Sequence, residues 1–371
     1  MLFQKLGPCI YTQLTQLIYK MSEFSNLCFL QHFLREKGEK SNQIINAIIK
    51  DEYDECKLIT DIPILPLIVL PMLPPLQKPL EGTIESCVRG LSKNQDVVRT
   101  GKKGEEYFWI VCCDGHGNNS FVDILKALDW QEIMEHPNSY YYLQSKLSTC
   151  RYTINSGSTL CMVKIFEDKI ECVSVGDSRV FIYKNEEMEY TNTPHLYSNE
   201  AEHRRLGSST TVKISNVRYE MFPAITSETS MTQKQLSYVT FSQKNKNESV
   251  TLAMTQSIGH YNITGFAPEF KTINYDSHMD HIRVIVGTDG FFDMSLVENT
   301  GTSAEEEAGR EKDKQDLLQL TAEELADKAE KRWKQQWKYY YGGSRFPNLF
   351  EETAFDKSSI DDIGIAVWSS V

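Results

Sequence analysis

The sequence predicts a mixed α+β domain whose strands are mostly antiparallel. Apolar, strand-like runs occur at 83–90 and 107–113, and three more follow closely at 159–166, 169–175 and 180–184. The links between the last three are too short for crossover helices, so these strands form antiparallel hairpins and not a doubly wound parallel sheet. With 371 residues, the chain can hold one α/β or sandwich-type domain of about 250 to 300 residues plus an extension.

Three segments have the patterning of helices. They cover 120–135, 199–206 and 321–337. The third begins with the run 321–324, Thr-Ala-Glu-Glu, which is a capping-box signature. Helices and hairpins therefore share one domain, which we expect to span residues 81–371.

Residues 1–80 are predicted to form a separate N-terminal extension. Helical patterning reaches about residue 58, and the apolar run 62–76 that follows contains five prolines. That run is too short and too broken by proline for a membrane-spanning helix, which needs about 20 continuous residues. We therefore expect no membrane span. We expect the run 62–76 to be an extended segment that packs on a neighbour or docks on a protein partner.

Two regions of the domain are predicted to be inserted surface loops. Residues 208–250 are polar and rich in turn formers, and residues 300–318 are charged with little apolar content. Segments of this composition bury too little apolar surface to order themselves.

Composition excludes several classes of protein. Charged residues make up 24% and aromatic residues 11%, as in folded globular chains. The net charge of −12 disfavours nucleic-acid binding, because phosphate repels an acidic surface. The nine cysteines include no Cys-x-x-Cys pair, which argues against a zinc or disulfide framework. We expect a reducing intracellular compartment, the cytoplasm, with the nucleus as an alternative.

The N-terminus leaves a weaker targeting alternative open. It lacks the uninterrupted apolar run of a secretory signal, but Lys5 and Lys20 occur with no acid before Glu23, a composition compatible with organelle targeting.

Four acids at the ends of strand-like runs indicate a metal site. Asp114 and Asp289 follow apolar runs and precede glycine, Asp177 follows a third run, and Asp361 precedes a fourth. A carboxylate at the end of a buried strand is held rigidly, and a glycine beside it lets backbone oxygen approach a ligand. Each Asp-Gly alone is an ordinary turn signal. The four together favour binding of a hard cation.

Seven short motifs, in order, resemble the metal-dependent protein phosphatases of type 2C. The resemblance covers about residue 81 to the C-terminus, and residues 1–80 have no counterpart in it. The motifs are Asn94-Gln95-Asp96, Val111-Cys112-Cys113-Asp114-Gly115-His116-Gly117, Ser156-Gly157-Ser158-Thr159, Val175-Gly176-Asp177-Ser178-Arg179, Leu252-Ala253-Met254-Thr255, Thr288-Asp289-Gly290-Phe291-Phe292-Asp293 and Ser359-Ile360-Asp361-Asp362-Ile363.

This resemblance implies a four-layer α/β/β/α sandwich of two mostly antiparallel sheets flanked by helices. It also implies a protein serine/threonine phosphatase that hydrolyses phosphoserine and phosphothreonine by in-line attack of a water bridging two Mn²⁺ or Mg²⁺ ions, with a weaker third ion. Carboxylate and carbonyl ligands independently suit such hard cations better than zinc. The implied metal-binding residues are Gln95, Asp96, Asp114, Gly115, Asp177, Asp289 and Asp361.

The resemblance assigns catalytic roles to Asp114, which would bridge both ions, and to His116 and Thr159. His116 would protonate the departing serine or threonine oxygen, a role that suits an ordinary histidine pKa of about 6.5. Thr159 would position His116 or a metal-bound water. The alternatives are a hydrogen-bonded turn histidine and a plain strand threonine.

Several positions depart from the family pattern near the expected phosphate site. Gln95 stands where many members have Glu, so it adds no charge to the metal site. Leu91 occupies the position of the family's phosphate-binding arginine. Arg89 and Lys93 flank it at strand period, and we expect one of them to bind phosphate instead.

Further departures lie in the loop after Asp114 and beside the cleft. Asn118 replaces a glycine, which is tolerable because Asn enters left-handed turns readily. Gln256 and His260 stand where members often have Arg and Asp.

Three functions remain open on the sequence. The first is an active protein serine/threonine phosphatase acting on a phosphorylated protein. The second is a catalytically weak pseudophosphatase that binds partners through its fold and residues 1–80. The third is the same chemistry on a small phosphoester. Phosphatases with a Cys nucleophile are disfavoured because the chain lacks Cys-x5-Arg at Cys112 or Cys113, and a phospho-aspartate mechanism is disfavoured because Asp114 does not begin an Asp-x-Asp motif.

Overall fold

The structure, a computed structural model, describes residues 80–242, 248–265, 267–340 and 350–370. The expected helical and proline-rich extension therefore lies outside the described residues, apart from its last residue. That residue, Leu80, is buried in the core of the domain.

The first sheet has five strands in the order β1-β17-β14-β7-β8, and every neighbouring pair is antiparallel. The first and last strands of the domain thus lie side by side, because β1 pairs with β17 along its full length. The strands are β1 (Gly82–Arg89), β7 (Arg179–Lys184), β8 (Glu187–Thr191), β14 (Ile282–Gly287) and β17 (Ile363–Ser370).

The second sheet has seven strands, ordered β12-β4-β3-β5-β6-β13, with β2 paired to β3. The predicted hairpin from β5 to β6 is present and antiparallel. The predicted hairpin from β6 to β7 is wrong, because the short link between them crosses from this sheet to the first one, where β7 pairs with β14 and β8. The strands are β2 (Asp96–Lys103), β3 (Tyr107–Gly117), β4 (Ser156–Ser158), β5 (Leu160–Ile165), β6 (Lys169–Val175), β12 (Ile258–Gly259) and β13 (Glu269–Asn274).

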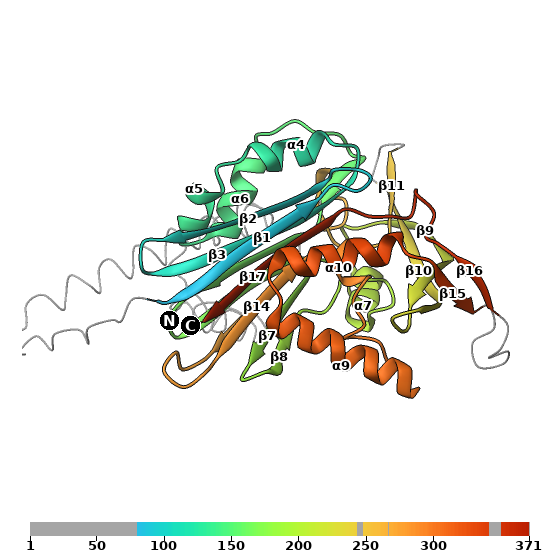
Figure 1. Cartoon of the computed structure of the whole chain (residues 1–371). Helices are drawn as coiled ribbons and strands as arrows, with labels where there is room; N and C mark the ends of the chain where they lie inside the picture. The colour runs from blue at the N-terminus through green and yellow to red at the C-terminus, as the bar shows by residue number, and fades with distance from the viewer. Residues whose placement is uncertain (1–79, 243–247, 266, 341–349, 371) are drawn as a thin grey trace, which may run out of the picture. The chain divides into compact units, whose positions relative to one another are not determined.

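Three apolar clusters show how the layers stack. One cluster joins side chains of β3, β5 and β6 to side chains of β7, β14 and β17, so the two sheets pack face to face. A second cluster packs α4 (Ser120–Ala127), α5 (Trp130–Glu135) and α6 (Ser139–Leu147) on the outer face of the seven-stranded sheet. A third packs α8 (Asp289–Phe292), α9 (Ala304–Gln319) and α10 (Ala322–Lys334) on the five-stranded sheet. The expected four-layer α/β/β/α sandwich is confirmed (Figure 1).

The prediction of a loop over 208–250 is wrong, because most of these residues form a β-hairpin. Strands β9 (Ile214–Ile225) and β10 (Ser230–Ser242) pair antiparallel over nearly their whole length. Only one face of β10 is buried at its far end, where Val239 and Phe241 enter a small core with α7 (Glu200–Ser208). Sparse apolar positions therefore concealed the strands.

The hairpin belongs to a third sheet of five strands. Its order is β11-β10-β15-β16, with β9 on β10. The short pair between β10 and β15 is parallel, whereas the other pairs of this sheet are antiparallel. The remaining strands are β11 (Ser249–Leu252), β15 (Trp337–Tyr340) and β16 (Phe350–Thr353).

The prediction of a loop over 300–318 is also wrong, because α9 occupies most of this range. Ser303 and Glu306 form a capping box at its start. Its buried stripe is Gly309, Asp313 and Leu317, with a single large apolar side chain. Because this helix buries an acid where a hydrophobic residue is usual, its sequence lacks the periodic spacing of apolar residues by which a helix is recognised.

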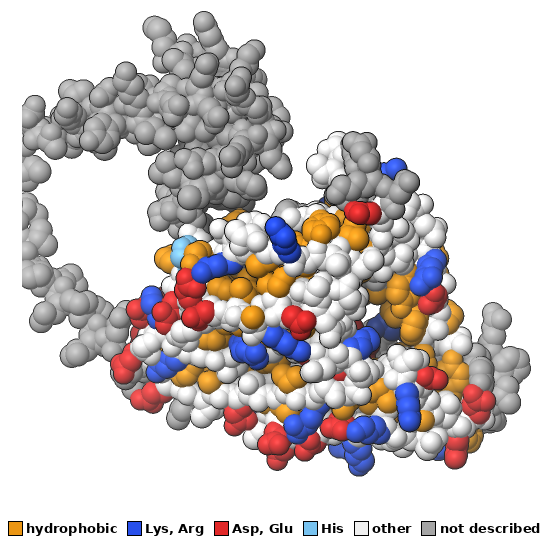
Figure 2. Space-filling view, turned by 90° about the horizontal axis from the view of Figure 1, so that it is seen from above, with side chains coloured by type: hydrophobic (Ala, Val, Ile, Leu, Met, Phe, Trp, Pro, Cys, Tyr) orange, Lys and Arg blue, Asp and Glu red, His pale blue; other side chains and the backbone are white. Residues whose placement is uncertain are grey.

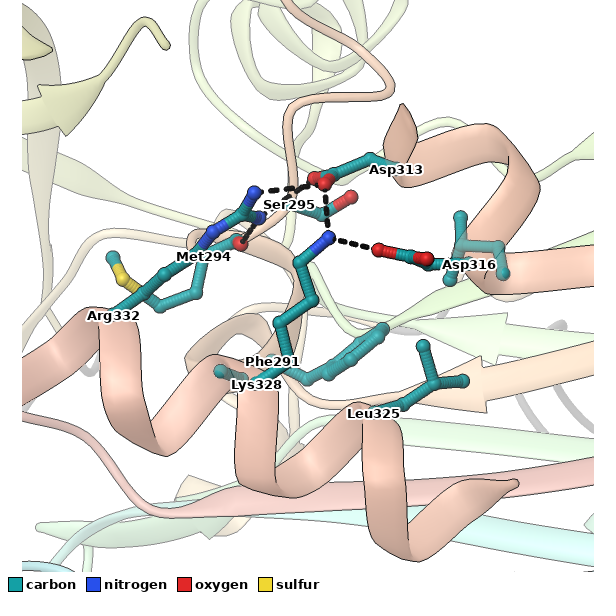
Figure 3. A pocket seen from close by; sticks show the side chains of 10 residues that line it. Phe291, Met294, Ser295, Asp313, Asp316, Leu325, Lys328 and Arg332 are labelled. Carbon is teal, nitrogen blue, oxygen red and sulfur yellow. Dashed lines mark hydrogen bonds and ion pairs between the residues drawn. The ribbon is translucent and has the colours of Figure 1, made fainter. Parts of the chain in front are cut away.

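Asp313 of α9 is neutralised by cations of α10. Arg332 donates to both of its carboxylate oxygens at 2.7 and 2.8 Å, and Lys328 reaches it at 2.5 Å (Figure 3). Arg332 also lies 2.9 Å from Glu228, in the turn between β9 and β10. This buried ion network ties both helices to the base of the hairpin.

The predicted helices differ from the observed ones mainly at their ends. The helix expected over 120–135 is broken between α4 and α5, where Asp129 caps α5 by accepting from the backbone N–H of Glu132. The capping box at Thr321 and Glu324 is present. Helix α10 ends at Lys334, and the chain enters β15 at Trp337. Helix α6 was not predicted.

The surface seen from above carries both signs of charge. In this view, blue Lys and Arg side chains lie among red Asp and Glu side chains, with orange hydrophobic groups between them (Figure 2). On this face the described residues make no continuous basic surface. None of the described helices combines the length and the apolar character that crossing a membrane would require.

Candidate metal centre

Strand register brings two of the acids together at one end of the seven-stranded sheet. Asp114, near the end of β3, is directly paired with Asp96, the first residue of β2. Both are buried, with exposures of 7% and 4%. The pairing is antiparallel, so the two Cα atoms face each other across the ladder.

The first sheet, β1-β17-β14-β7-β8, contributes three more acids at its corresponding end. Gly287, the last residue of β14, pairs with Arg179 at the start of β7 and with Ile365 near the start of β17. Residues just after β14, just before β7 and just before β17 therefore lie together. These positions hold Asp289, Asp177 and Asp361.

Three of these acids converge on one point. Ligand oxygens of Asp114, Asp177 and Asp289 all lie within 4.8 Å of one another. The Oδ1 atoms of Asp177 and Asp289 are buried and have no hydrogen-bond partner among the described residues. Buried charges without a counter-charge are costly. We therefore regard this acidic cluster as a candidate cation site, and its all-oxygen donor set fits Mg²⁺ or Mn²⁺ better than zinc.

Burial and mutual repulsion raise the pKa values of the acids. Burial, followed by the charges of Asp177 and Asp361, holds the pKa of Asp289 well above its usual value. Burial also raises the pKa of Asp177 to about 6. Burial raises the pKa of Asp96 to about 8, although a hydrogen bond from Thr288 opposes the shift. A divalent cation would stabilise the ionised forms of all these groups.

Lys93 already places a positive charge at the rim of the acidic cluster. Its Nζ lies 3.3 and 3.1 Å from the two carboxylate oxygens of Asp361. Burial lowers the pKa of Lys93, but the carboxylates of Asp361, Asp114 and Asp289 outweigh burial and raise it overall. The structure thus brings Lys93, one of the two predicted phosphate-binding residues, to the acids.

Arg89, the other predicted phosphate-binding residue, points elsewhere. It lies 2.9 Å from Asp327, 3.4 Å from Glu323 and 3.6 Å from Glu330, all on α10. Three carboxylates neutralise this guanidinium and would repel a phosphate. The prediction assumed that strand geometry continues past residue 89, but β1 ends at Arg89 and the chain turns before Lys93.

Gln95 precedes Asp96, and its amide nitrogen bonds to the loop after β3. Its Nε2 donates to the carbonyl of Gly117 at 3.0 Å and to Oδ1 of Asn119 at 2.7 Å. These bonds use the amide nitrogen to hold the loop after β3, and they leave the amide oxygen for the predicted metal-binding role. Gly115 lies between Asp114 and that loop, and a Cβ there would lie 2.1 Å from Val122, so only glycine fits.

Thr159 supports Asp114 and not His116. Its Oγ1 accepts from the backbone N–H of Asp114 at 2.9 Å and shares a 2.6 Å hydrogen bond with Ser178. Its own N–H donates to the carbonyl of Asp114 at 2.9 Å, and Ser158 Oγ donates to the same carbonyl at 2.9 Å. Thr159 is fully buried, so it positions the acid and does not reach a substrate.

His116 lies next to the cluster with both ring nitrogens free. Neither nitrogen has a hydrogen-bond partner among the described residues. Its ring stacks on His260, with centroids 4.8 Å apart and planes inclined by 27°. Burial, and next the neighbouring His260, hold the pKa of His116 well below its usual value. The pKa of His116 therefore lies below the ordinary histidine value that would suit a proton donor.

Two residues at the site, Asp362 and Asp293, stand in the motifs of the sequence analysis but were given no role there. Asp362 accepts four backbone N–H groups from the connection between β1 and β2, and so fixes the segment that carries Lys93. Asp293 follows Asp289 by one helical turn, and Lys234 of β10 approaches it at 3.8 Å. The spacing of four between Asp289 and Asp293 was a readable signal.

Comparison with known proteins identifies the family. The model of the family described as protein phosphatase 2C matches residues 134–333, which is more than half of the 371 residues. The match contains Asp177 and Asp289 but not Asp114 or Asp361. Comparison with curated proteins gives no significant match.

Three solved structures are among those similar to this chain. A C. elegans sex determining protein has 14% identity and a TM-score of 0.42, covering 78% of this chain and 65% of that one. A serine/threonine phosphatase of S. agalactiae has 17% identity and a TM-score of 0.41, covering 77% and 99%. The catalytic domain of the serine/threonine protein phosphatase PstP, in complex with two manganese ions, has 11% identity and a TM-score of 0.39, covering 79% and 99%. The family itself rests on the family model: because that model spans more than half of its length, this chain belongs to the protein phosphatase 2C family.

Proposed function

We propose that this protein is a metal-dependent serine/threonine phosphatase that hydrolyses phosphoserine and phosphothreonine in proteins. The observation that carries the proposal is the convergence of Asp114, Asp177 and Asp289 within 4.8 Å, with two buried carboxylate oxygens left without partners. Family membership supports the same reaction class.

The proposed ion ligands are the acids at the ends of the strands. Asp114, Asp289 and Asp361 would hold two Mn²⁺ or Mg²⁺ ions, Asp96 would support them, and Asp177 would serve a weaker third ion. When bound, such ions supply an activated water and stabilise charge on the phosphoryl oxygens. Asp362 is not a ligand candidate, because backbone N–H groups occupy both of its oxygens.

His116 is the proposed proton donor to the departing serine or threonine oxygen. Its two ring nitrogens are buried and have no hydrogen-bond partner among the described residues, so either could bond to a substrate oxygen brought against the ring. The ring is neutral at pH 7 in the structure, and a bound phosphate dianion would raise its pKa and favour protonation. In this account the ring takes up a proton from water when the dianion binds, and no neighbouring carboxylate has to hold that proton in advance.

Lys93 is the proposed phosphate contact at the rim. Its ammonium lies 3.1 Å from Asp361, next to the point where the acids converge. An ammonium group offers a point charge and not the bidentate fork of an arginine, so we expect weaker orientation of the phosphate than an arginine would give.

A catalytically weak, partner-binding protein is the second candidate function. Two observations favour it: the Lys93 ammonium competes with an ion for Asp361, and the pKa of His116 is lowered. The expected role of residues 1–80 in binding a protein partner belongs to this candidate and lies outside the described residues.

Hydrolysis assays separate these candidates. Purified protein is incubated with a phosphothreonine peptide or with p-nitrophenyl phosphate, with and without Mn²⁺ or Mg²⁺. We expect metal-dependent turnover of the peptide that is lost in Asp289→Asn and kept in Asp356→Asn, which changes an exposed acid. Folded protein without turnover would refute the proposal and favour the partner-binding candidate. Turnover of small phosphoesters alone would favour the third alternative.

A further inference from the structure

His260 lies in a strained turn beside the candidate site. Three successive residues have left-handed backbones, His260, Tyr261 and Asn262, with φ of 46°, 51° and 58°. The left-handed conformation is unfavourable for most residues with a Cβ, and less so for Asn. Such strain persists only where the surroundings determine the conformation, and it gathers at functional sites.

The surroundings of His260 are built to accept its ring. The side chain is fully buried, and its Nδ1 donates to the carbonyl of Ile154 at 2.5 Å. Gly157 provides the space, because a Cβ there would lie 2.2 Å from the ring of His260. Gly259, at φ +85°, allows the chain to turn sharply into this position.

The buried ring of His260 stacks on the ring of His116. Gly157 of β4 pairs with His116 of β3, so the space left by Gly157 is adjacent to the proposed proton donor. The two rings stack with centroids 4.8 Å apart. Nε2 of His260 is buried without a hydrogen-bond partner among the described residues, so hydrogen bonding alone does not explain an imidazole here.

The geometry points to His260 as a positioning residue that holds the ring of His116 by stacking. Neither ring nitrogen of His116 has a well-aligned hydrogen bond among the described residues, so the stacked ring of His260 is a contact that can restrain its plane. This inference rests on the proposed function of His116 as proton donor to the departing oxygen.

The test compares leaving groups of different basicity. An alkoxide from phosphothreonine needs a proton to depart, whereas p-nitrophenolate does not. His260→Asn is the informative variant, because Asn tolerates left-handed backbone and its amide can still reach the carbonyl of Ile154. We expect kcat on the peptide to fall about tenfold or more, within the range that proton donation contributes. We expect kcat on p-nitrophenyl phosphate to change less than about threefold.

Two further variants serve as controls. His260→Phe keeps a ring against His116 and should restore most of the peptide activity. Tyr261→Phe alters the same turn, where the hydroxyl of Tyr261 donates to the carbonyl of Tyr152, without touching the stack. It should leave the ratio of the two activities unchanged. An equal loss on both substrates in His260→Asn, or no rescue by phenylalanine, would overturn the inference.

A second measurement does not depend on activity. The ring signals of His116, assigned with His116→Gln, are followed by NMR in each variant without added metal. We expect them to shift or broaden in His260→Asn and to stay much nearer to wild type in Tyr261→Phe. Unchanged His116 signals in His260→Asn would overturn the inference even if the wild-type protein had no phosphatase activity. Inactive wild-type protein with the expected NMR changes would instead count against the proposed function, and the stacking role would stand.

Discussion

Asp362→Asn tests how the connection between β1 and β2 is held. One oxygen of Asp362 accepts from the N–H groups of Leu91, Ser92 and Lys93 at 2.8, 2.9 and 3.2 Å, and the other accepts from Gln95 at 2.7 Å. The side chain is 1% exposed, so water cannot replace these bonds. The substitution keeps the shape but turns one acceptor into a donor and removes the charge.

The magnitude follows from these four bonds. Placing an amide NH₂ against one of the N–H groups leaves a buried donor unsatisfied, which costs about 1–3 kcal/mol. The remaining bonds lose charge assistance, which roughly doubles the strength of such bonds. Loss of repulsion between Asp362 and Asp96 offsets part of this, since Asp362 contributes to the raised pKa of Asp96. We expect a net loss of about 3 kcal/mol, or a fall in Tm of about 6–12 °C for a domain of this size.

Denaturant unfolding of the metal-free protein measures this loss, provided that the slope of the transition is unchanged. The matched control is Asp356→Asn, whose carboxylate accepts from the N–H and hydroxyl of Ser358 on the exposed surface. We expect the control to cost less than about 1 kcal/mol. If Asp362→Asn cost no more than the control, the reasoning about the connection would be refuted.

Three further predictions concern the ion network, the rim lysine and pH. Arg332→Met should destabilise the protein by about 3 kcal/mol, because it breaks a buried pair with Asp313. Lys93→Met should strengthen Mn²⁺ binding measured by calorimetry, because it removes the ammonium that contacts Asp361. The Tm of metal-free protein should fall as pH rises from about 5 to about 9. The pKa of the Asp96 carboxyl is raised from 3.8 to about 8, so its stabilising contribution is complete below 3.8 and is lost as pH rises through 8.

Each of these predictions has a result that contradicts it. For the ion network, the double variant Arg332→Met with Asp313→Leu should regain much of the loss, and a single variant as stable as wild type would contradict the buried-pair argument. For the rim lysine, unchanged or weaker Mn²⁺ binding would show that Lys93 does not compete for Asp361. For pH, a Tm that rises across the interval, or an equal fall in Asp96→Asn, would contradict the assignment.

Much of the fold was predictable because its signals are local. The short link between β5 and β6 indicated their antiparallel pair, whereas the similarly short link from β6 to β7 joins strands of different sheets. The acids at strand ends marked one end of both sheets. Helix α9 was not predictable in this way, because its buried stripe places Asp313 where an apolar residue is expected. The β9–β10 hairpin was missed because most of its side chains are not buried.

The acidic residues of the site were predictable from the sequence, whereas its basic residues were less so. Strand period placed Arg89 and Lys93 on one face, but β1 ends between them and only Lys93 reaches the acids. The role of Asp362 depends on backbone N–H groups about 270 residues away in sequence, a distance that no local pattern reports. The stack of His260 on His116 likewise depends on the pairing of β3, β4 and β12.

Calorimetric titration with Mn²⁺, in buffers of different ionisation enthalpy, tests the central claim that the acidic cluster is a divalent-ion centre. The account predicts that wild-type protein binds the ion with release of protons, because burial and repulsion raise the pKa values of Asp96, Asp177 and Asp289. It also predicts that Asp289→Asn loses this binding, whereas Asp356→Asn keeps it. Equal affinity in wild type and Asp289→Asn, or no binding by folded wild-type protein, would contradict it.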